Sequence, residues 1–205
     1  MRAFKVHNLW PFPVYENEIP VKSKWKEFVL NLEYERTHVD NSDISKDRYV
    51  LNNILDLKDE IKSHVNNFTE KYLCVKNTAD FYLQNSWSNI HKPGENSQIH
   101  SHQNSLLSAV YYPIYPKNSG GLRFHRNNLH QNLFHKSITL DYYEYNDLNS
   151  DQYVIDIQEG SIVVFPSLLM HDVLKNESNE NRYSLAANYF VRGEFGKEEY
   201  TLKLK

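Results

Sequence analysis

Two hydrophobic patterns divide the chain, and the first is helical. From residue 21 to about residue 72 the apolar positions recur every three or four residues, which predicts amphipathic helices. A short first stripe consists of Trp25, Phe28, Val29 and Leu32. A longer second stripe consists of Leu51, Ile54, Leu55, Ile61, Val65 and Phe68. Residues 37–47, between the stripes, are polar and are predicted to form a loop.

Beyond residue 72 the pattern becomes that of β-strands. Runs rich in β-branched and aromatic residues cover 82–87, 105–112, 121–125, 153–157, 161–165 and 183–191. Turn-forming residues separate these runs, and no clearly helical stretch lies between them, so parallel βαβ topology is not expected. The pattern therefore predicts an antiparallel sandwich, jelly roll or barrel, with the N-terminal helices packed on one face.

The length of 205 residues fits a single domain, with residues 1–75 as helical N-terminal support and residues 76–205 as the β core. The chain has ten His and one Cys. Cys74 has no partner for a disulfide and no second thiolate for a zinc site. Any metal must therefore be held by His and carboxylate side chains.

Charge and hydropathy narrow the classes of partner. The net charge of −3 gives no sign of a nucleic-acid footprint. The apolar run around residues 162–170 is too short to cross a membrane, and the N-terminus lacks the apolar centre of a signal peptide. We therefore expect a cytoplasmic protein that acts on a small-molecule or peptide substrate. Its oligomeric state stays open, with a homodimer as one option.

Three histidines are candidates for a metal site. His100 and His102 stand two positions apart, so in a strand both point to one face, with Cα atoms roughly 6.6 Å apart. His171 follows a Gly turn and an apolar strand that ends at Pro166. The alternative for the first two is a pair of exposed or hydrogen-bonded histidines with no ligand role.

Arg182 opens an otherwise apolar strand, where an unpaired buried charge would be costly. It either lies at an exposed strand end or binds an anion. If residues 170–174 and 182–189 form a hairpin, His171 lies opposite Ala186, and Arg182 and Ser184 share its face. That spacing suits a small dicarboxylate held between a metal at His171 and the guanidinium of Arg182.

These residues resemble the motif of the iron(II)- and 2-oxoglutarate-dependent oxygenases, in the group similar to prolyl 4-hydroxylases. The resemblance covers about residues 81–193 and implies a double-stranded β-helix, a jelly roll of cupin-like type. It implies His100 and His171 as iron ligands and Arg182 as the residue that binds the far carboxylate of 2-oxoglutarate. Tyr112 matches a tyrosine that contacts the same carboxylate, and Ser184 completes an Arg-x-Ser.

A narrower resemblance rests on several short motifs taken together. The chain supplies Trp-x-Asn at 87–89, His-x-His-x-Asn-Ser at 100–105, Ser-x-x-Tyr-Tyr at 108–112 and Phe-Pro-Ser-x-x-x-His at 165–171. One position departs from the hydroxylases, because His102 stands where their second ligand is a carboxylate. A register that uses His102 and Asn104, or a carboxylate from Asp141 or Asp156, are the alternatives left open.

The implied activity uses Fe(II) on His100, His102 and His171, with 2-oxoglutarate and O2 as cosubstrates. It would couple decarboxylation of 2-oxoglutarate to hydroxylation of a C–H bond, in a prolyl or other amino-acid substrate. The alternatives are a cupin-like metal-binding protein and a three-His dioxygenase that does not use 2-oxoglutarate. The polar stretch 124–136, with His125, His130 and His135, is either a substrate-facing loop or a solvated excursion.

Overall fold

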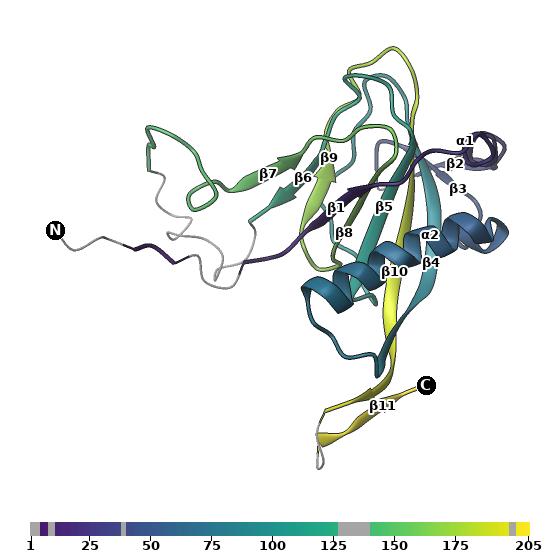
Figure 1. The fold of residues 1–205 in the computed structure, drawn as a ribbon. Helices are drawn as coiled ribbons and strands as arrows, with labels where there is room; N and C mark the ends of the chain where they lie inside the picture. The colour runs from purple at the N-terminus through teal and green to yellow at the C-terminus, as the bar shows by residue number, and fades with distance from the viewer. Residues whose placement is uncertain (1–4, 8–10, 38–39, 127–139, 197–199) are drawn as a thin grey trace.

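The computed structural model describes residues 5–7, 11–37, 40–126, 140–196 and 200–205. These residues form two facing β-sheets, with helices on the outer face of the larger one (Figure 1). The larger sheet has the strand order β1-β8-β5-β10-β4-β3-β2, with β11 paired to the end of β10. Every pair of neighbouring strands in it is antiparallel, as the sequence pattern predicts.

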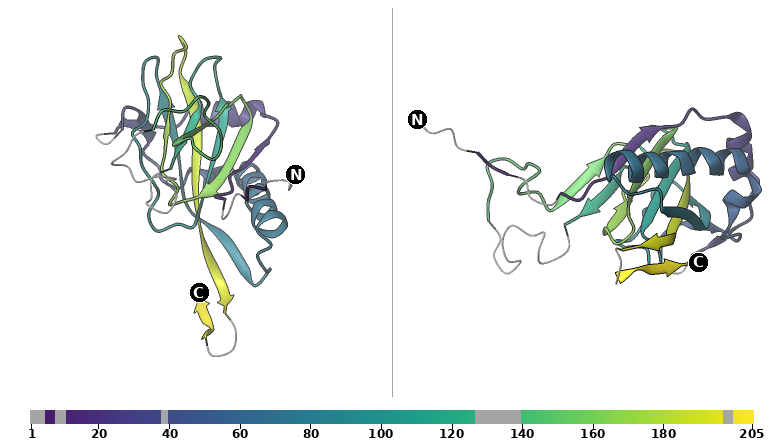
Figure 2. Two further views of the ribbon diagram at one scale, coloured as in Figure 1. Left: turned by 90° about the vertical axis from the view of Figure 1, so that its left-hand side faces the viewer. Right: turned by 60° about the horizontal axis from the view of Figure 1, so that its bottom comes forward.

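The strands of the larger sheet are β1 (Tyr15–Glu18), β2 (Tyr34–Arg36), β3 (Asp43–Ser45), β4 (Ala79–His91), β5 (Leu107–Ile114), β8 (Ser161–Pro166), β10 (Arg182–Phe195) and β11 (Leu202–Leu204). The smaller sheet has the order β7-β6-β9, from β6 (Leu122–His125), β7 (Gln152–Ile155) and β9 (His171–Val173). The paired ends of β10 and β11 project from the body in Figures 1 and 2.

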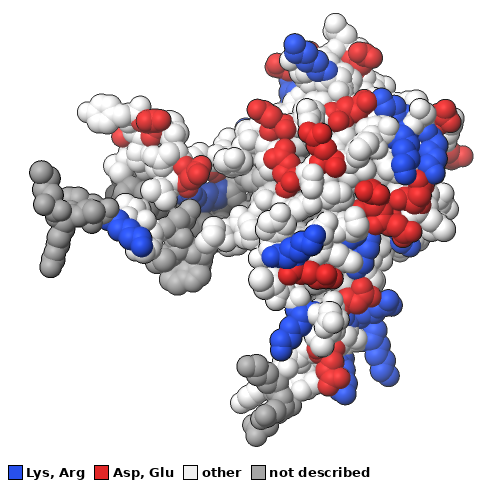
Figure 3. Space-filling view, in the orientation of Figure 1, with Lys and Arg blue, Asp and Glu red and all other residues white. Residues whose placement is uncertain are grey.

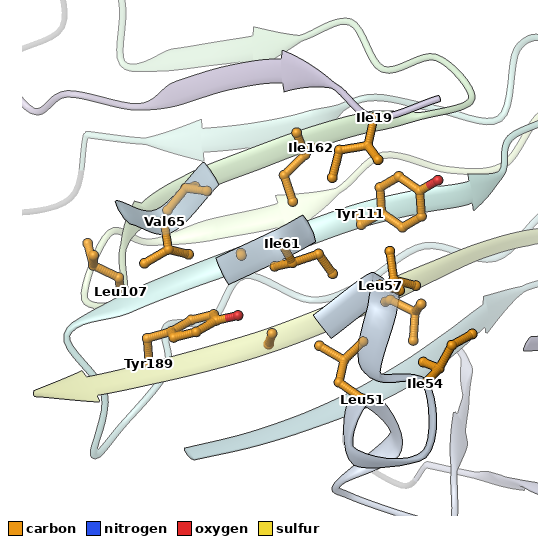
Figure 4. Close-up of a cluster of buried hydrophobic side chains, with 14 of the residues drawn as sticks. Ile19, Leu51, Ile54, Leu57, Ile61, Val65, Leu107, Tyr111, Ile162 and Tyr189 are labelled. Carbon is orange, nitrogen blue, oxygen red and sulfur yellow. The ribbon is translucent and has the colours of Figure 1, made fainter. Parts of the chain in front are cut away.

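Helix α1 (Ser23–Leu30) and helix α2 (Leu55–Asn66) cover the larger sheet. A 3-10 turn (Val50–Asn53) precedes α2, and a π-helical turn (Asn67–Tyr72) follows it. Leu57, Ile61 and Val65 of α2 are fully buried against the sheet (Figure 4). Burying each such side chain stabilises the fold by about 1.5–3 kcal/mol. This apolar layer forms one of the two cores.

The second core lies between the two sheets, because alternate strand residues face opposite sides. On β10, Leu185, Ala187 and Tyr189 belong to the helix-side core, whereas Ala186 belongs to the core between the sheets. Phe165 of β8 and Phe124 of β6 meet edge to face there, with ring centroids 5.0 Å apart. The residues predicted to carry chemistry lie beside this second core.

Three details of the sequence prediction are wrong. Strand β3 lies within residues 37–47, which were predicted to be loop. It was missed because it pairs with β4, which is distant in the sequence. Leu32 lies beyond the end of α1. The hairpin between 170–174 and 182–189 does not form, because β9 pairs with β6 in the smaller sheet and β10 lies between β4 and β5 in the larger one.

No helix in the described part of the chain is both long and apolar enough to cross a membrane. On the face seen in Figure 3, Lys and Arg side chains are interspersed with Asp and Glu side chains. Among the described residues, ion pairs such as Arg36–Glu95 and Lys26–Glu159 join side chains of opposite charge. That face is therefore of mixed charge.

Candidate metal centre

The three predicted histidines come together at one edge of the space between the sheets. His171 is the first residue of β9, and its backbone exchanges two hydrogen bonds of 2.9 Å with the backbone of His100. The ring centroid of His171 lies 4.4 Å from that of His100 and 5.0 Å from that of His102. One potential ligand atom from each ring lies within 4.8 Å of the others. The three side chains can therefore reach a common ion.

Hydrogen bonds fix the direction of each imidazole. Nδ1 of His100 donates to the carbonyl of Gln98 at 2.7 Å, and Nδ1 of His171 donates to the carbonyl of Leu169 at 2.8 Å. Because a carbonyl only accepts, both rings carry their proton on Nδ1. In the neutral tautomer with the proton on Nδ1, Nε2 can bind a metal, which is the arrangement typical of metal-binding histidines.

His102 is held by a buried network from the larger sheet. Its Nδ1 lies 2.7 Å from the Asn188 side-chain oxygen and 2.7 Å from the Ser108 hydroxyl. The Ser108 hydroxyl donates to the same Asn188 oxygen and lies 2.9 Å from the hydroxyl of Ser167. The Trp87 ring also packs edge-on against His102, with centroids 5.5 Å apart. The network therefore orients the side chain that stands where the related hydroxylases have a carboxylate.

Burial keeps two of the three rings neutral. It lowers the pKa of His171 to about 3 and that of His102 to about 4, with a further lowering from the neighbouring His100. A neutral imidazole is the form that binds a metal. This donor set fits Fe(II), which imidazole ligands suit.

The alternatives for the second ligand are not supported in the described residues. Asp141, Asp156 and Asn104 are exposed, and no carboxylate joins the three-His cluster within that part of the chain. Asp172 follows His171 in β9 and points to the other side of the strand, because successive side chains of a strand alternate. There it accepts two hydrogen bonds from Arg123, at 2.9 and 2.5 Å, and contacts His125 at 3.0 Å.

Arg182 begins β10 and is fully buried, so the interpretation of an exposed strand end is wrong. Its Nη1 donates to the backbone carbonyls of Ser119 and Leu174. Its Nε and Nη2 have no hydrogen-bond partner among the described residues. Burial lowers the pKa of Arg182, which means that its charge is poorly solvated. The free Nε–Nη2 edge is the fork that binds a carboxylate in bidentate fashion.

Two more predicted residues lie on the same side of the larger sheet. The hydroxyl of Tyr112 is buried and unpartnered within the described structure, and burial raises its pKa, so it remains a donor. Ser184 is buried two residues after Arg182, on the same face of β10. An anion between the sheets would therefore meet a guanidinium and a phenol. These donors fit a carboxylate such as the far end of 2-oxoglutarate.

Sequence reasoning missed several polar residues of this interior. His91 is 2% exposed, and neither ring nitrogen has a partner among the described residues. Ser108 and Ser167 entered only as members of sequence motifs, and Asn188 was not singled out, although it is polar in an otherwise apolar strand. That polarity at a buried position was the available signal. His130 and His135 lie outside the described residues, whereas His125 binds Asp172.

Comparison with known proteins assigns the family. A family model described as "Putative 2OG-Fe(II) oxygenase" matches residues 85–188, just over half of the chain. The match runs from β4 to β10 and includes the three histidines and Arg182. The chain belongs to this family and is an Fe(II)- and 2-oxoglutarate-dependent dioxygenase, with O2 as the second cosubstrate. No curated protein matches the sequence.

Solved structures of low sequence identity share the fold. A prolyl-4-hydroxylase from Pseudomonas putida is 17% identical, with a TM-score of 0.54, over 89% of this chain and 94% of that one. HygX from Streptomyces hygroscopicus, with nickel, 2-oxoglutarate and hygromycin B bound, is 11% identical, with a TM-score of 0.60, over 87% and 83%. An oxidoreductase of the 2OG-Fe(II) oxygenase family from Burkholderia pseudomallei is 14% identical, with a TM-score of 0.58, over 82% and 76%. The fold is therefore the double-stranded β-helix that the resemblance implies.

Proposed function

We propose that His100, His102 and His171 hold the iron of this dioxygenase and that Arg182, Tyr112 and Ser184 bind its 2-oxoglutarate. The observation that carries this assignment is that two groups of polar atoms, on the imidazoles and on the guanidinium, have no hydrogen-bond partner among the described residues. Within the described residues, three imidazoles have Nδ1 engaged and Nε2 without a hydrogen bond, and a buried guanidinium has its Nε–Nη2 edge without a partner. The buried guanidinium edge is costly in a folded protein unless a ligand occupies it.

The protein residues would position 2-oxoglutarate and limit the access of water to the metal. The carbonyls of Ser119 and Leu174 immobilise one nitrogen of Arg182, so the remaining fork is aimed before 2-oxoglutarate arrives. Tyr112 would add a third donor to the same carboxylate. Bound iron, together with 2-oxoglutarate and O2, supplies the oxidant that converts R–H to R–OH with release of succinate and CO2. The apolar wall of Phe124 and Phe165 beside His171 limits access of water.

The third histidine changes the charge of the centre. Three neutral imidazoles leave the Fe(II) complex one unit more positive than a set of two histidines and one carboxylate does. The metal-binding carboxylate of a bound 2-oxoglutarate would then offset one of the two positive charges, while its far carboxylate pairs with Arg182. We expect metal retention to depend more strongly on 2-oxoglutarate here than in an enzyme with a carboxylate ligand.

For the substrate we propose a peptide or a free amino acid, with a prolyl residue as the first to be tested. The named likeness to a prolyl-4-hydroxylase supports this choice. The lone Cys74 and the requirement for Fe(II) favour the reducing cytoplasm as the place of action.

The test is turnover with Fe(II), 2-oxoglutarate and O2, followed by mass spectrometry of proline-containing peptides and free amino acids. The proposal predicts one added oxygen atom in the product and one succinate per product molecule. Arg182→Met should lose turnover at low 2-oxoglutarate and recover part of it at high concentration. A wild-type protein that forms no succinate with any substrate and does not bind 2-oxoglutarate would refute the assignment.

A further inference from the structure

The last residue of β4 stands directly opposite the first residue of β10. His91 and Arg182 are paired across these antiparallel strands, so their side chains leave the sheet on the same face. Directly opposite residues have Cβ atoms about 4.5–5.5 Å apart. His91 is 2% exposed and Arg182 is fully buried. The imidazole therefore lies beside the guanidinium in the interior.

Both nitrogens of His91 lack a hydrogen-bond partner among the described residues. The unpartnered atoms of Arg182 and Tyr112 come from the two strands next in order, β10 and β5. A row of unsatisfied polar groups thus crosses three neighbouring strands. Native proteins leave few buried polar atoms unpaired, so such a row points to a ligand of matching polarity.

The ionisation state defines what His91 can offer. Burial, followed by the charges of Arg182 and Arg36, lowers the pKa of His91 to about 3. The ring is therefore neutral at physiological pH and presents one N–H donor. It is not a second cation beside Arg182.

We propose that His91 contacts the cosubstrate and donates its N–H to the far carboxylate of 2-oxoglutarate. This inference rests on the proposed function of Arg182 and Tyr112. A carboxylate offers about four lone-pair positions. The Arg182 fork supplies two donors, and the Tyr112 hydroxyl and the His91 N–H supply one each. The four donors match the capacity of one carboxylate.

The backbone around His91 is held by the same loop that holds Arg182. Buried Asn176 donates from Nδ2 to the carbonyl of His91 at 2.8 Å. Two residues earlier, the carbonyl of Leu174 accepts from Nη1 of Arg182 at 3.2 Å. Because one short segment fixes both groups, their relative position is set before the cosubstrate binds.

The test compares the affinities of two ligands for the full-length protein loaded with Mn(II) in the absence of O2. One ligand is 2-oxoglutarate, and the other is 2-oxopentanoate, which keeps the metal-chelating end but lacks the far carboxylate. Calorimetry should show that His91→Phe weakens 2-oxoglutarate roughly 10- to 100-fold, as expected for a lost hydrogen bond to a charged group. The affinities for 2-oxopentanoate and for Mn(II) should stay within about twofold, because the metal centre is unaltered.

Two kinds of control variant separate contact from packing. His91→Asn and His91→Gln each place an amide donor near one of the two ring nitrogens, and at least one should recover most of the affinity. His64→Phe removes another buried histidine, which binds Tyr15 in the helix-side core, and should leave 2-oxoglutarate binding unchanged. An unchanged 2-oxoglutarate affinity in His91→Phe, or an equal loss for both ligands, would overturn the inference.

A measurement on the wild-type protein keeps the inference testable if the variants do not fold. In protein loaded with Zn(II) and labelled with 15N-histidine, the ring resonances of His91 should shift on addition of 2-oxoglutarate. They should not shift with 2-oxopentanoate, and a lack of response to both ligands would overturn the inference. Arg182→Met distinguishes the two levels of the account. If Arg182→Met binds 2-oxoglutarate as tightly as the wild type, the proposed function fails. If Arg182→Met loses affinity for 2-oxoglutarate but His91→Phe keeps it, only the His91 inference fails.

Discussion

At the scale of single residues, the site depends on polar groups whose partners lie far away in the sequence. Asn188 is 86 positions from His102, yet it holds the ring of that histidine in the orientation that the proposed metal binding needs. The charge of Arg182 is oriented by backbone carbonyls rather than by a carboxylate among the described residues. Neutral polar groups, the Asn188 amide and two backbone carbonyls, therefore orient the side chains of His102 and Arg182.

Asn188→Leu should weaken metal binding by roughly 10- to 100-fold, as expected when the partner of a metal-bound histidine is removed. The physical reason is that Nδ1 of His102 loses its best acceptor and the ring is free to turn. Titration with Mn(II) or Fe(II) without O2 measures this loss. Asn188→Asp keeps the acceptor oxygen and should bind metal at least as tightly as the wild type. Equal weakening in both variants would contradict this role.

The buried His91 should make stability depend on pH. Its pKa is near 6.5 when unfolded and about 3 when folded, so between these values the unfolded chain binds the extra proton. The free energy of unfolding therefore falls as the pH drops below about 6.5, by about 1.4 kcal/mol for each pH unit. Urea denaturation at pH 7 and pH 5 should show a loss in the wild type about 2 kcal/mol larger than in His91→Gln. Equal losses would show that His91 is not buried in the neutral form.

At the scale of elements, the segment 119–121 before β6 connects the fold to the site. Gly120 has φ +86°, and a Cβ there would lie 2.5 Å from the carbonyl oxygen of Leu174. Ser119 and Leu174 both contribute carbonyls to Arg182. A side chain at Gly120 would consequently displace the groups that aim the guanidinium.

Gly120→Ala should destabilise the fold by about 2–4 kcal/mol, through backbone strain and the clash with Leu174. It should also weaken 2-oxoglutarate binding in the fraction that folds. The matched control is Gly94→Ala, because Gly94 has φ +88° but its Cβ would meet only the end of Lys175 at 4.0 Å. That variant should lose only about 1–2 kcal/mol, with unchanged 2-oxoglutarate affinity. Urea denaturation and calorimetry measure both effects, and similar results for the two glycines would contradict the account.

At the scale of the whole molecule, the larger sheet separates two interiors with different tasks. The face toward α2 is apolar and supplies stability, and the face toward the smaller sheet carries the polar site. Ile61→Ala should therefore lower the free energy of unfolding by about 2–5 kcal/mol in urea denaturation. The affinity of the folded fraction for Mn(II) should stay within about twofold of the wild type. A large loss of metal affinity would show that the two faces are coupled.

The sequence was most informative where local pattern decides the structure. Alternation and turn residues located the strands of the β core, and the motif resemblance selected His100, His171 and Arg182 before any contact was known. The hairpin of β9 with β10 was wrong because a pattern of period two does not say which sheet a strand joins. His91 was missed because only the pairing with Arg182 reveals its importance, and that pairing joins residues 91 positions apart. The assignment of the whole chain to one domain stays a prediction.

The central claim is that three histidines and Arg182 bind Fe(II) and 2-oxoglutarate at one site. Its most direct test is the visible charge-transfer band that forms when 2-oxoglutarate chelates Fe(II), recorded without O2. The wild type should show this band, His102→Ala and His171→Ala should lose it, and Arg182→Met should show it only at much higher 2-oxoglutarate. An unchanged band at unchanged affinity in His102→Ala would show that His102 is not a ligand and would contradict the three-His centre.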